Sequence, residues 1–175
     1  MVIALHYLAH TRGDKKTMPK ETILILDKDL HIQWTLKTSL ENERYIVVSV
    51  NSIERVLRSF SEFEVSGFIT EYWIGHSNSV EMLREIKNTY PWLYVMMLTD
   101  ADIMENEYEE IINAGVDDFF LKPISTKKLL LHLRKGLKQR RTFLEKNRLE
   151  QELKRIIGTK ETDNVNQAMS QAVLK

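Results

Sequence analysis

Two short apolar runs, each followed by one polar side chain, constrain the fold of this chain most strongly. Residues 94–98 precede Thr99, and residues 116–121, which end in the apolar stretch Phe119-Phe120-Leu121, precede Lys122. Apolar runs of this length are typical of strands that are buried on both faces of a parallel sheet. The carboxyl ends of such strands line the crevice in which open α/β sheets bind ligands. The runs therefore predict that a hydroxyl and an ammonium group meet at one edge of a sheet.

Three more apolar runs lie upstream, and segments with helical spacing or helix-capping residues separate all five. The upstream runs are residues 22–26, 45–50 and 67–71. The helical segments are residues 30–40, 53–60, 79–86 and 105–114, with a final helix from about residue 127. Strands that alternate with helices in this way predict a doubly wound α/β domain with five parallel strands.

Further polar side chains follow the upstream runs. Asp27, Lys28 and Asp29 come directly after the first run, and Glu71 ends the third. Carboxylate oxygens are the ligands that Mg²⁺ prefers, while hydroxyl and ammonium groups stabilise phosphoryl oxygens. The strand ends together thus predict a crevice with the groups needed to bind a divalent cation and a phosphoryl group.

The pattern divides the chain into four parts. They are a flexible extension at residues 1–20, the α/β domain at 21–137, a helical extension at 138–158 and a polar, disordered tail at 159–175. The final helix has no predicted break before Gly158, so its second half extends past the domain. Its apolar spacing is compatible with a coiled coil, although arginines interrupt a strict heptad.

Composition limits the functions that this chain can have. The 175 residues have a formal net charge of zero, which favours neither nucleic acid nor an anionic membrane as a partner. The chain has no cysteine, which excludes disulfides and thiolate chemistry and is typical of a cytoplasmic protein. No apolar run reaches the ~18 residues that a membrane-spanning helix needs.

Five segments, in this order and spacing, give a specific resemblance. They are residues 23–29, 67–71, 81–87, 95–99 and 114–123. From about residue 20 to residue 137, the chain resembles the receiver domain of two-component response regulators, and the last two segments are highly specific to that family. The resemblance implies a flavodoxin-like fold with strand order 2-1-3-4-5, followed here by the long helix.

The resemblance also implies roles for individual residues. Asp27 matches an acid that helps to bind magnesium, while Thr99 and Lys122 match the residues that stabilise the phosphoryl group. Phe119 matches an aromatic residue that acts as a rotameric switch. The peptide bond before Pro123 is usually cis in that family, and proline lowers the cost of this form.

Two positions depart from the family pattern. Lys28 replaces the second acid of the magnesium pair, and Glu71 replaces the phosphoacceptor aspartate. The extra methylene of Glu71 moves its carboxylate by roughly 1.5 Å, and a shift of that size can reduce reactivity about a hundredfold. Lys28 removes a ligand and adds a positive charge. We therefore expect no required cofactor, at most a weak magnesium site at Asp27, and no ordinary phosphorylation.

The ammonium of Lys28 could instead neutralise Asp27 or Glu71, with a contact worth up to ~4 kcal/mol before desolvation. Glu71 would then either mimic a phosphorylated acid permanently or hold the site in one inert state, and the sequence leaves both open. In either case the chain is expected to be a signalling module and not an enzyme.

The same interpretation predicts the binding partners of the chain. We expect a histidine kinase or an effector protein, contacted through the face of the Glu105 helix, fifth strand and final helix, or through the long helix. That helix is also expected to form a homodimer. The basic stretch at residues 134–141 is read as a solvated helix face, so neither nucleic acid nor a membrane is expected as a partner of this chain.

Two other functions compete with this interpretation. One is a conventional response regulator that is phosphorylated on Glu71 or on a neighbour such as Ser77. The other is a small Mg²⁺-dependent phosphohydrolase of the haloacid dehalogenase type, suggested by Asp27-x-Asp29. That family also has an acidic pair later in the chain, which Asp117 and Asp118 would match here. In that family, however, the lysine precedes this pair, whereas Lys122 follows Asp118.

Overall fold

A parallel sheet of five strands forms the centre of the molecule. The computed structural model describes residues 20–100, 103 and 105–173. The strands are β1 (Thr22–Leu26), β2 (Ile46–Val50), β3 (Val65–Glu71), β6 (Tyr94–Thr99) and β7 (Asp118–Leu121). Their order is β2-β1-β3-β6-β7, and every neighbouring pair is parallel. The predicted doubly wound fold and the strand order implied by the resemblance are confirmed.

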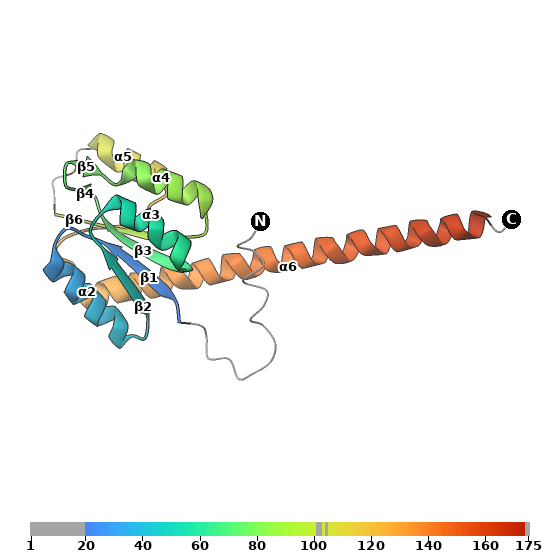
Figure 1. Cartoon of the computed structure of the whole chain (residues 1–175), viewed down its shortest axis with the longest axis horizontal. Helices are drawn as coiled ribbons and strands as arrows, with labels where there is room; N and C mark the ends of the chain where they lie inside the picture. Colours follow the sequence, from blue (N-terminus) through green and yellow to red (C-terminus); the bar gives the residue numbers. More distant parts are fainter. Residues whose placement is uncertain (1–19, 101–102, 104, 174–175) are drawn as a thin grey trace.

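Helices cover both faces of the sheet (Figure 1). One face packs against α2 (Leu30–Asn42) and the first turns of α6 (Thr126–Val173), and the other against α3 (Ile53–Glu62), α4 (Val80–Thr89) and α5 (Glu105–Asn113). Because side chains alternate along a strand, neighbouring residues of one strand enter different cores. In β1, Leu24 belongs to the α3–α4–α5 core and Ile23 to the α2–α6 core.

The backbone of helix α6 passes very close to strand β6 of the sheet. A Cβ atom added at Gly136 would lie only 2.1 Å from a ring carbon of Tyr94 in β6. Glycine inside a helix normally lowers stability relative to alanine, by roughly 1 kcal/mol. The close approach to Tyr94 explains why a residue without a side chain occupies this position.

Ion pairs anchor α6 where it leaves the domain. Arg141 contacts both carboxylate oxygens of Glu21, at 2.7 and 2.8 Å, and Arg134 pairs with Glu43 after α2. Glu21 directly precedes β1, so the helix is tied to the amino edge of the sheet. The predicted basic helix face is therefore partly used in contacts within the domain.

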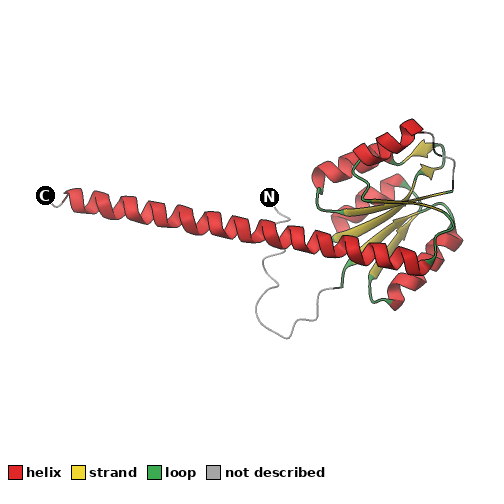
Figure 2. Ribbon diagram, turned by 180° about the vertical axis from the view of Figure 1, so that it is seen from behind, coloured by secondary structure: helices red, strands yellow, loops and turns green. Residues whose placement is uncertain are grey.

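Beyond these anchors, α6 projects away from the sheet as one long helix (Figure 2). It continues to Val173, past Gly158, where the sequence pattern placed the end of the helix. The apolar side chains of Leu149, Leu153 and Ile156 are exposed on it. The predicted extension at residues 1–20 lies, apart from its last residue, outside the described residues. Of the helices that the structure describes, none has both the length and the apolar character needed to cross a membrane.

Candidate functional site

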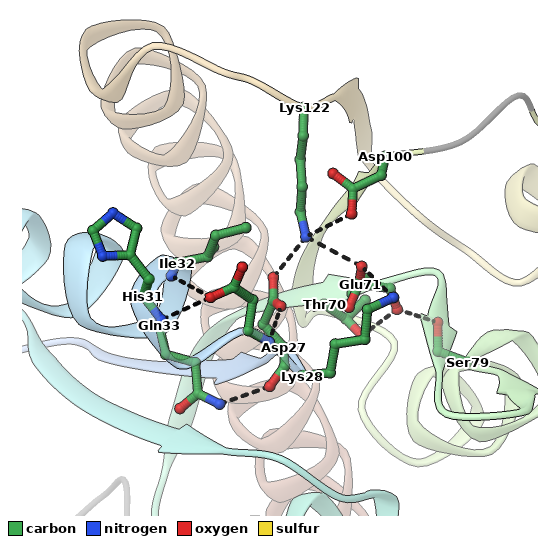
Figure 3. Close-up of polar contacts among 11 residues, drawn as sticks. Asp27, Lys28, His31, Ile32, Gln33, Thr70, Glu71, Ser79, Asp100 and Lys122 are labelled. Atoms are coloured by element: carbon green, nitrogen blue, oxygen red, sulfur yellow. Dashed lines mark hydrogen bonds and ion pairs between the residues drawn. The ribbon is translucent and has the colours of Figure 1, made fainter.

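Four strands deliver polar side chains to the carboxyl edge of the sheet. Asp27 follows β1, Glu71 ends β3, Thr99 ends β6 and Lys122 follows β7. The ammonium of Lys122 lies 2.9 Å from Asp27 Oδ2 and 3.2 Å from Glu71 Oε1, as Figure 3 shows. The side chain of Thr99 is buried at the same edge, and its carbonyl accepts a hydrogen bond from the amide of Lys122 at 2.8 Å. The structure thus brings the predicted crevice residues together.

Lys122 is the centre of this cluster. Its side chain is only 8% exposed, and a third carboxylate, that of Asp100, approaches to 3.8 Å. Burial opposes the charged form, but the hydrogen bonds and charges of Asp27 and Glu71 outweigh it, so the pKa of Lys122 is raised above its usual range. Lys122 therefore carries its positive charge throughout the physiological pH range.

The second ammonium of the site belongs to Lys28. Its Nζ lies 3.3 Å from Glu71 Oε1, the same oxygen that Lys122 contacts. The Lys28 side chain is 54% exposed, whereas that of Glu71 is 2% exposed. Asp27 and Glu71 were the two expected partners of Lys28, and the structure places it against Glu71. Two ammonium groups thereby match the two buried carboxylates of Asp27 and Glu71.

Backbone contacts fix the position of Glu71. Its carbonyl accepts hydrogen bonds from the hydroxyl of Ser79 at 2.9 Å and from that of Thr70 at 3.1 Å. Ser79 lies at the start of α4, as predicted, but its hydroxyl donates to Glu71 and does not cap the helix. The side chain of Asn78 accepts a hydrogen bond from the amide of Val80 instead. Oxygen Oε2 of Glu71 is buried and has no hydrogen-bond partner among the side chains and backbone that the structure describes.

The carboxylate of Asp29 lies at the start of α2 and not in the acidic pocket where it was predicted. This carboxylate accepts hydrogen bonds from the amides of His31 and Ile32, at 2.8 and 3.3 Å, and so caps α2. These backbone hydrogen bonds lower the pKa of Asp29. Asp29 contributes to the pocket only through its own amide, which donates to Asp27 Oδ1 at 2.8 Å. The carboxylate predicted for the acidic pocket is therefore a helix cap.

The resemblance implied two features in and just after β7; the structure shows the cis bond before Pro123, while the switching role of Phe119 stays a prediction. Phe119 is partly buried, and its ring packs edge-on against Tyr108 of α5 with centroids 5.4 Å apart. The bond between Lys122 and Pro123 is cis.

The segment after Glu71 forms a second, two-stranded sheet. Strands β4 (Trp73–Ile74) and β5 (Ser77–Asn78) form a small antiparallel hairpin, with Gly75 at a positive φ of 64° in its turn. Trp73 packs edge-on against Tyr72, with centroids 5.1 Å apart.

Three residues near the site were missed by sequence reasoning. They are Asp100, which approaches Lys122, Gln33, whose amide donates to the Asp27 carbonyl at 2.6 Å, and Tyr72, which hydrogen-bonds to Glu107 of α5. Asp100 directly follows Thr99, so the strand end itself could have indicated it. Gln33 and Tyr72 interact through tertiary contacts for which the sequence contains no local signal.

The donor set does not fit a bound magnesium ion in this arrangement. Both carboxylate oxygens of Asp27 already accept hydrogen bonds, and two ammonium groups contact Glu71. Magnesium needs octahedral oxygen ligands and is repelled by neighbouring cations. Within the described residues, no group of three or more His, Cys, Asp and Glu side chains could hold a metal ion.

Comparisons with known proteins point to the same family as the sequence resemblance. The family model described as response regulator receiver domain matches residues 23–134. The alginate biosynthesis transcriptional regulatory protein AlgB of Pseudomonas putida is 26% identical over 133 residues, which cover 76% of this chain and 30% of that protein. The heme response regulator HssR of Staphylococcus saprophyticus is 26% identical over 118 residues, which cover 67% of this chain and 52% of that protein. The chain thus spans about a third to a half of these relatives.

Solved structures share the fold. The signal receiver domain of an HD domain-containing protein from Pseudomonas fluorescens matches with a TM-score of 0.70 and 22% identity, over 77% of this chain and 98% of that one. A CheY-like receiver domain protein from Methanospirillum hungatei matches with a TM-score of 0.66 and 24% identity, over 70% and 98% of the two chains.

Proposed function

Because the chain belongs to the response regulator receiver domain family, we propose that it is a receiver that signals without ordinary phosphorylation. It acts by binding other proteins and not as an enzyme. A histidine kinase or an effector is the expected partner, in the cytoplasm.

The observation that carries this proposal is the position of Glu71 between two ammonium groups. Lys122, which in a conventional receiver would hold a phosphoryl oxygen, is 3.2 Å from Glu71 Oε1. Lys28, at the position of a magnesium ligand, is 3.3 Å from the same oxygen. Built-in side chains thus supply the charges that a cation and a phosphoryl group would otherwise supply. A phosphodonor would have to approach a carboxylate that is buried and already paired.

Exposed apolar side chains support a proposal for the surface through which the receiver binds its partners. Ile112 of α5 is 69% exposed and Leu131 of α6 is 66% exposed. The projecting part of α6 exposes further apolar residues and supports the proposal of a homodimer through this helix. A helix that projects without packing partners is marginally stable in water, so a second copy would stabilise it.

The test is chemical phosphorylation. The protein is incubated with Mg²⁺ and acetyl phosphate, a small-molecule phosphodonor, and its intact mass is measured. We expect no added phosphoryl group on the unmodified protein, and one added group on the double variant Lys28→Asp, Glu71→Asp. A phosphoryl group on the unmodified protein would contradict the proposal and favour a conventional phosphoacceptor.

A further inference from the structure

Tyr72 links the end of β3 to helix α5. It directly follows Glu71, its side chain is fully buried, and its hydroxyl donates a hydrogen bond to Glu107 Oε1 at 3.0 Å. Burial, together with this carboxylate, raises the pKa of Tyr72 to about 12. The hydroxyl therefore keeps its proton at neutral pH and acts as the donor to a charged acceptor, which is the stronger kind of hydrogen bond.

The backbone of Tyr72 is fixed together with that of Glu71. One residue, Ser79, holds both of them. Its amide donates to the carbonyl of Tyr72 at 2.9 Å, and its hydroxyl donates to the carbonyl of Glu71 at 2.9 Å. A displacement of Glu71 is thus passed to Tyr72, because the two carbonyls share one partner.

Helix α5 depends on such contacts for its position. It has only nine residues, and an isolated helix of this length is unstable in water. Two consecutive residues near its start contact different parts of the sheet, since Glu107 meets Tyr72 after β3 and Tyr108 packs against Phe119 within β7. The side of the helix that carries Ile112 faces solvent.

We propose that Tyr72 is a positioning residue that couples Glu71 to α5 through Glu107. The state of the Glu71 pocket then reaches the exposed side of α5 along β3, by a path separate from Phe119. This inference holds whether or not Glu71 accepts a phosphoryl group, so its failure and that of the proposed function can be told apart.

The first experiment removes only the hydroxyl. In Tyr72→Phe, we expect amide hydrogen exchange in α5 to become about tenfold faster or more, because a charge-assisted hydrogen bond is lost. Exchange in β1 should stay slow, which shows that the variant is folded. The matched control is Tyr90→Phe, in the same core, where the ring stacks on Phe60 with centroids 5.0 Å apart. Unchanged exchange of α5 in Tyr72→Phe would overturn the proposal.

Changes at the acceptor give an independent readout. Glu107→Gln keeps an oxygen that can accept from Tyr72, so α5 exchange should stay closer to that of the unmodified protein than in Glu107→Ala. Equal acceleration in both variants would contradict a role for this hydrogen bond.

The coupling itself is measured with a double-mutant cycle. Glu71→Gln should shift the amide resonances of α5 in the unmodified protein, and the shift should be largely lost when Tyr72→Phe is also present. Shifts of equal size in both backgrounds would show that Glu71 reaches α5 by another path and would overturn the proposal.

Discussion

The ammonium of Lys28 lies 3.3 Å from Glu71 Oε1, so a half-exposed lysine neutralises a carboxylate that is 2% exposed. Lys28 and Glu71 are the two residues that the sequence comparison with the family pattern singled out as departures. The two substitutions therefore form one structural unit, in which the change at one position provides the partner for the change at the other.

The two lysines of the site should differ in their contribution to stability. Lys122→Met leaves Asp27 and Glu71 buried without their main partner, and we expect a loss of about 3–5 kcal/mol in the free energy of unfolding. The side chain of Lys28 is half exposed, so Lys28→Met should cost about 1 kcal/mol or less. Urea denaturation of both variants measures the difference. Equal losses would contradict the central position of Lys122.

The contribution of Lys122 has a defined pH dependence. The folded protein raises its pKa above the ordinary value of 10.5. A raised pKa means that the folded state binds the proton more tightly, so the stabilisation is fully present below pH 10.5 and is lost as pH rises through the folded value. The stability difference between the unmodified protein and Lys122→Met should be constant near neutral pH and shrink in alkali. A difference that already shrinks near pH 8 would contradict this assignment.

Asp29 should behave as a helix cap and not as a pocket residue. Asp29→Ala is expected to lower stability, and Asp29→Asn to retain most of it, because asparagine also accepts the two amide hydrogen bonds. Since the folded state lowers the pKa of Asp29, its contribution is present above the unfolded value of 3.8 and is lost as pH falls through the folded value. Thermal unfolding as a function of pH measures this. An equal loss in both variants at neutral pH would contradict the capping role.

Gly136 should tolerate no side chain. Gly136→Ala is expected to lower the free energy of unfolding by about 1–3 kcal/mol, because the added carbon would overlap the ring of Tyr94. The gain in helix propensity, about 1 kcal/mol, offsets only part of this cost. Urea denaturation, with the exposed Lys135→Ala on the same helix as control, checks the prediction. A more stable Gly136→Ala variant would show that α6 can move away from β6.

The projecting part of α6 should form the homodimer. We expect sedimentation velocity at high micromolar concentration to give a dimer, and the double variant Leu149→Lys, Leu153→Lys to give a monomer. Both leucines are exposed on one side of the helix. Lys154→Ala, on the same turns, serves as control and should remain dimeric. A monomer for the unmodified protein under these conditions would remove this proposal.

Much of the fold and the centre of the site follow from the sequence because they depend on local patterns. Apolar runs locate the strands, and parallel strands end at one edge, so the meeting of Asp27, Glu71, Thr99 and Lys122 is a consequence of topology. Asp29 shows the limit of this reasoning. An acid after a strand can face the crevice or cap the next helix, and only the backbone direction distinguishes the two.

Other features depend on distances between segments that are far apart in the chain. Gly136 looks like an ordinary weak point of a helix until Tyr94 is seen against it. Tyr72 looks like one more buried aromatic residue, and its link to Glu107 spans 35 positions of sequence. Each contact joins two different elements, and a helical or strand period reports only on residues within one element, so the sequence provides no signal for these contacts.

The central claim is tested most directly by titrating the protein with Mg²⁺ and beryllofluoride, a phosphoryl mimic, and following the amide resonances of Thr99, Phe119 and Lys122. We expect no saturable change in the unmodified protein and a saturable change in the double variant Lys28→Asp, Glu71→Asp. A saturable change in the unmodified protein would contradict the account, because it would show that the pocket still accepts a cation and a phosphoryl group.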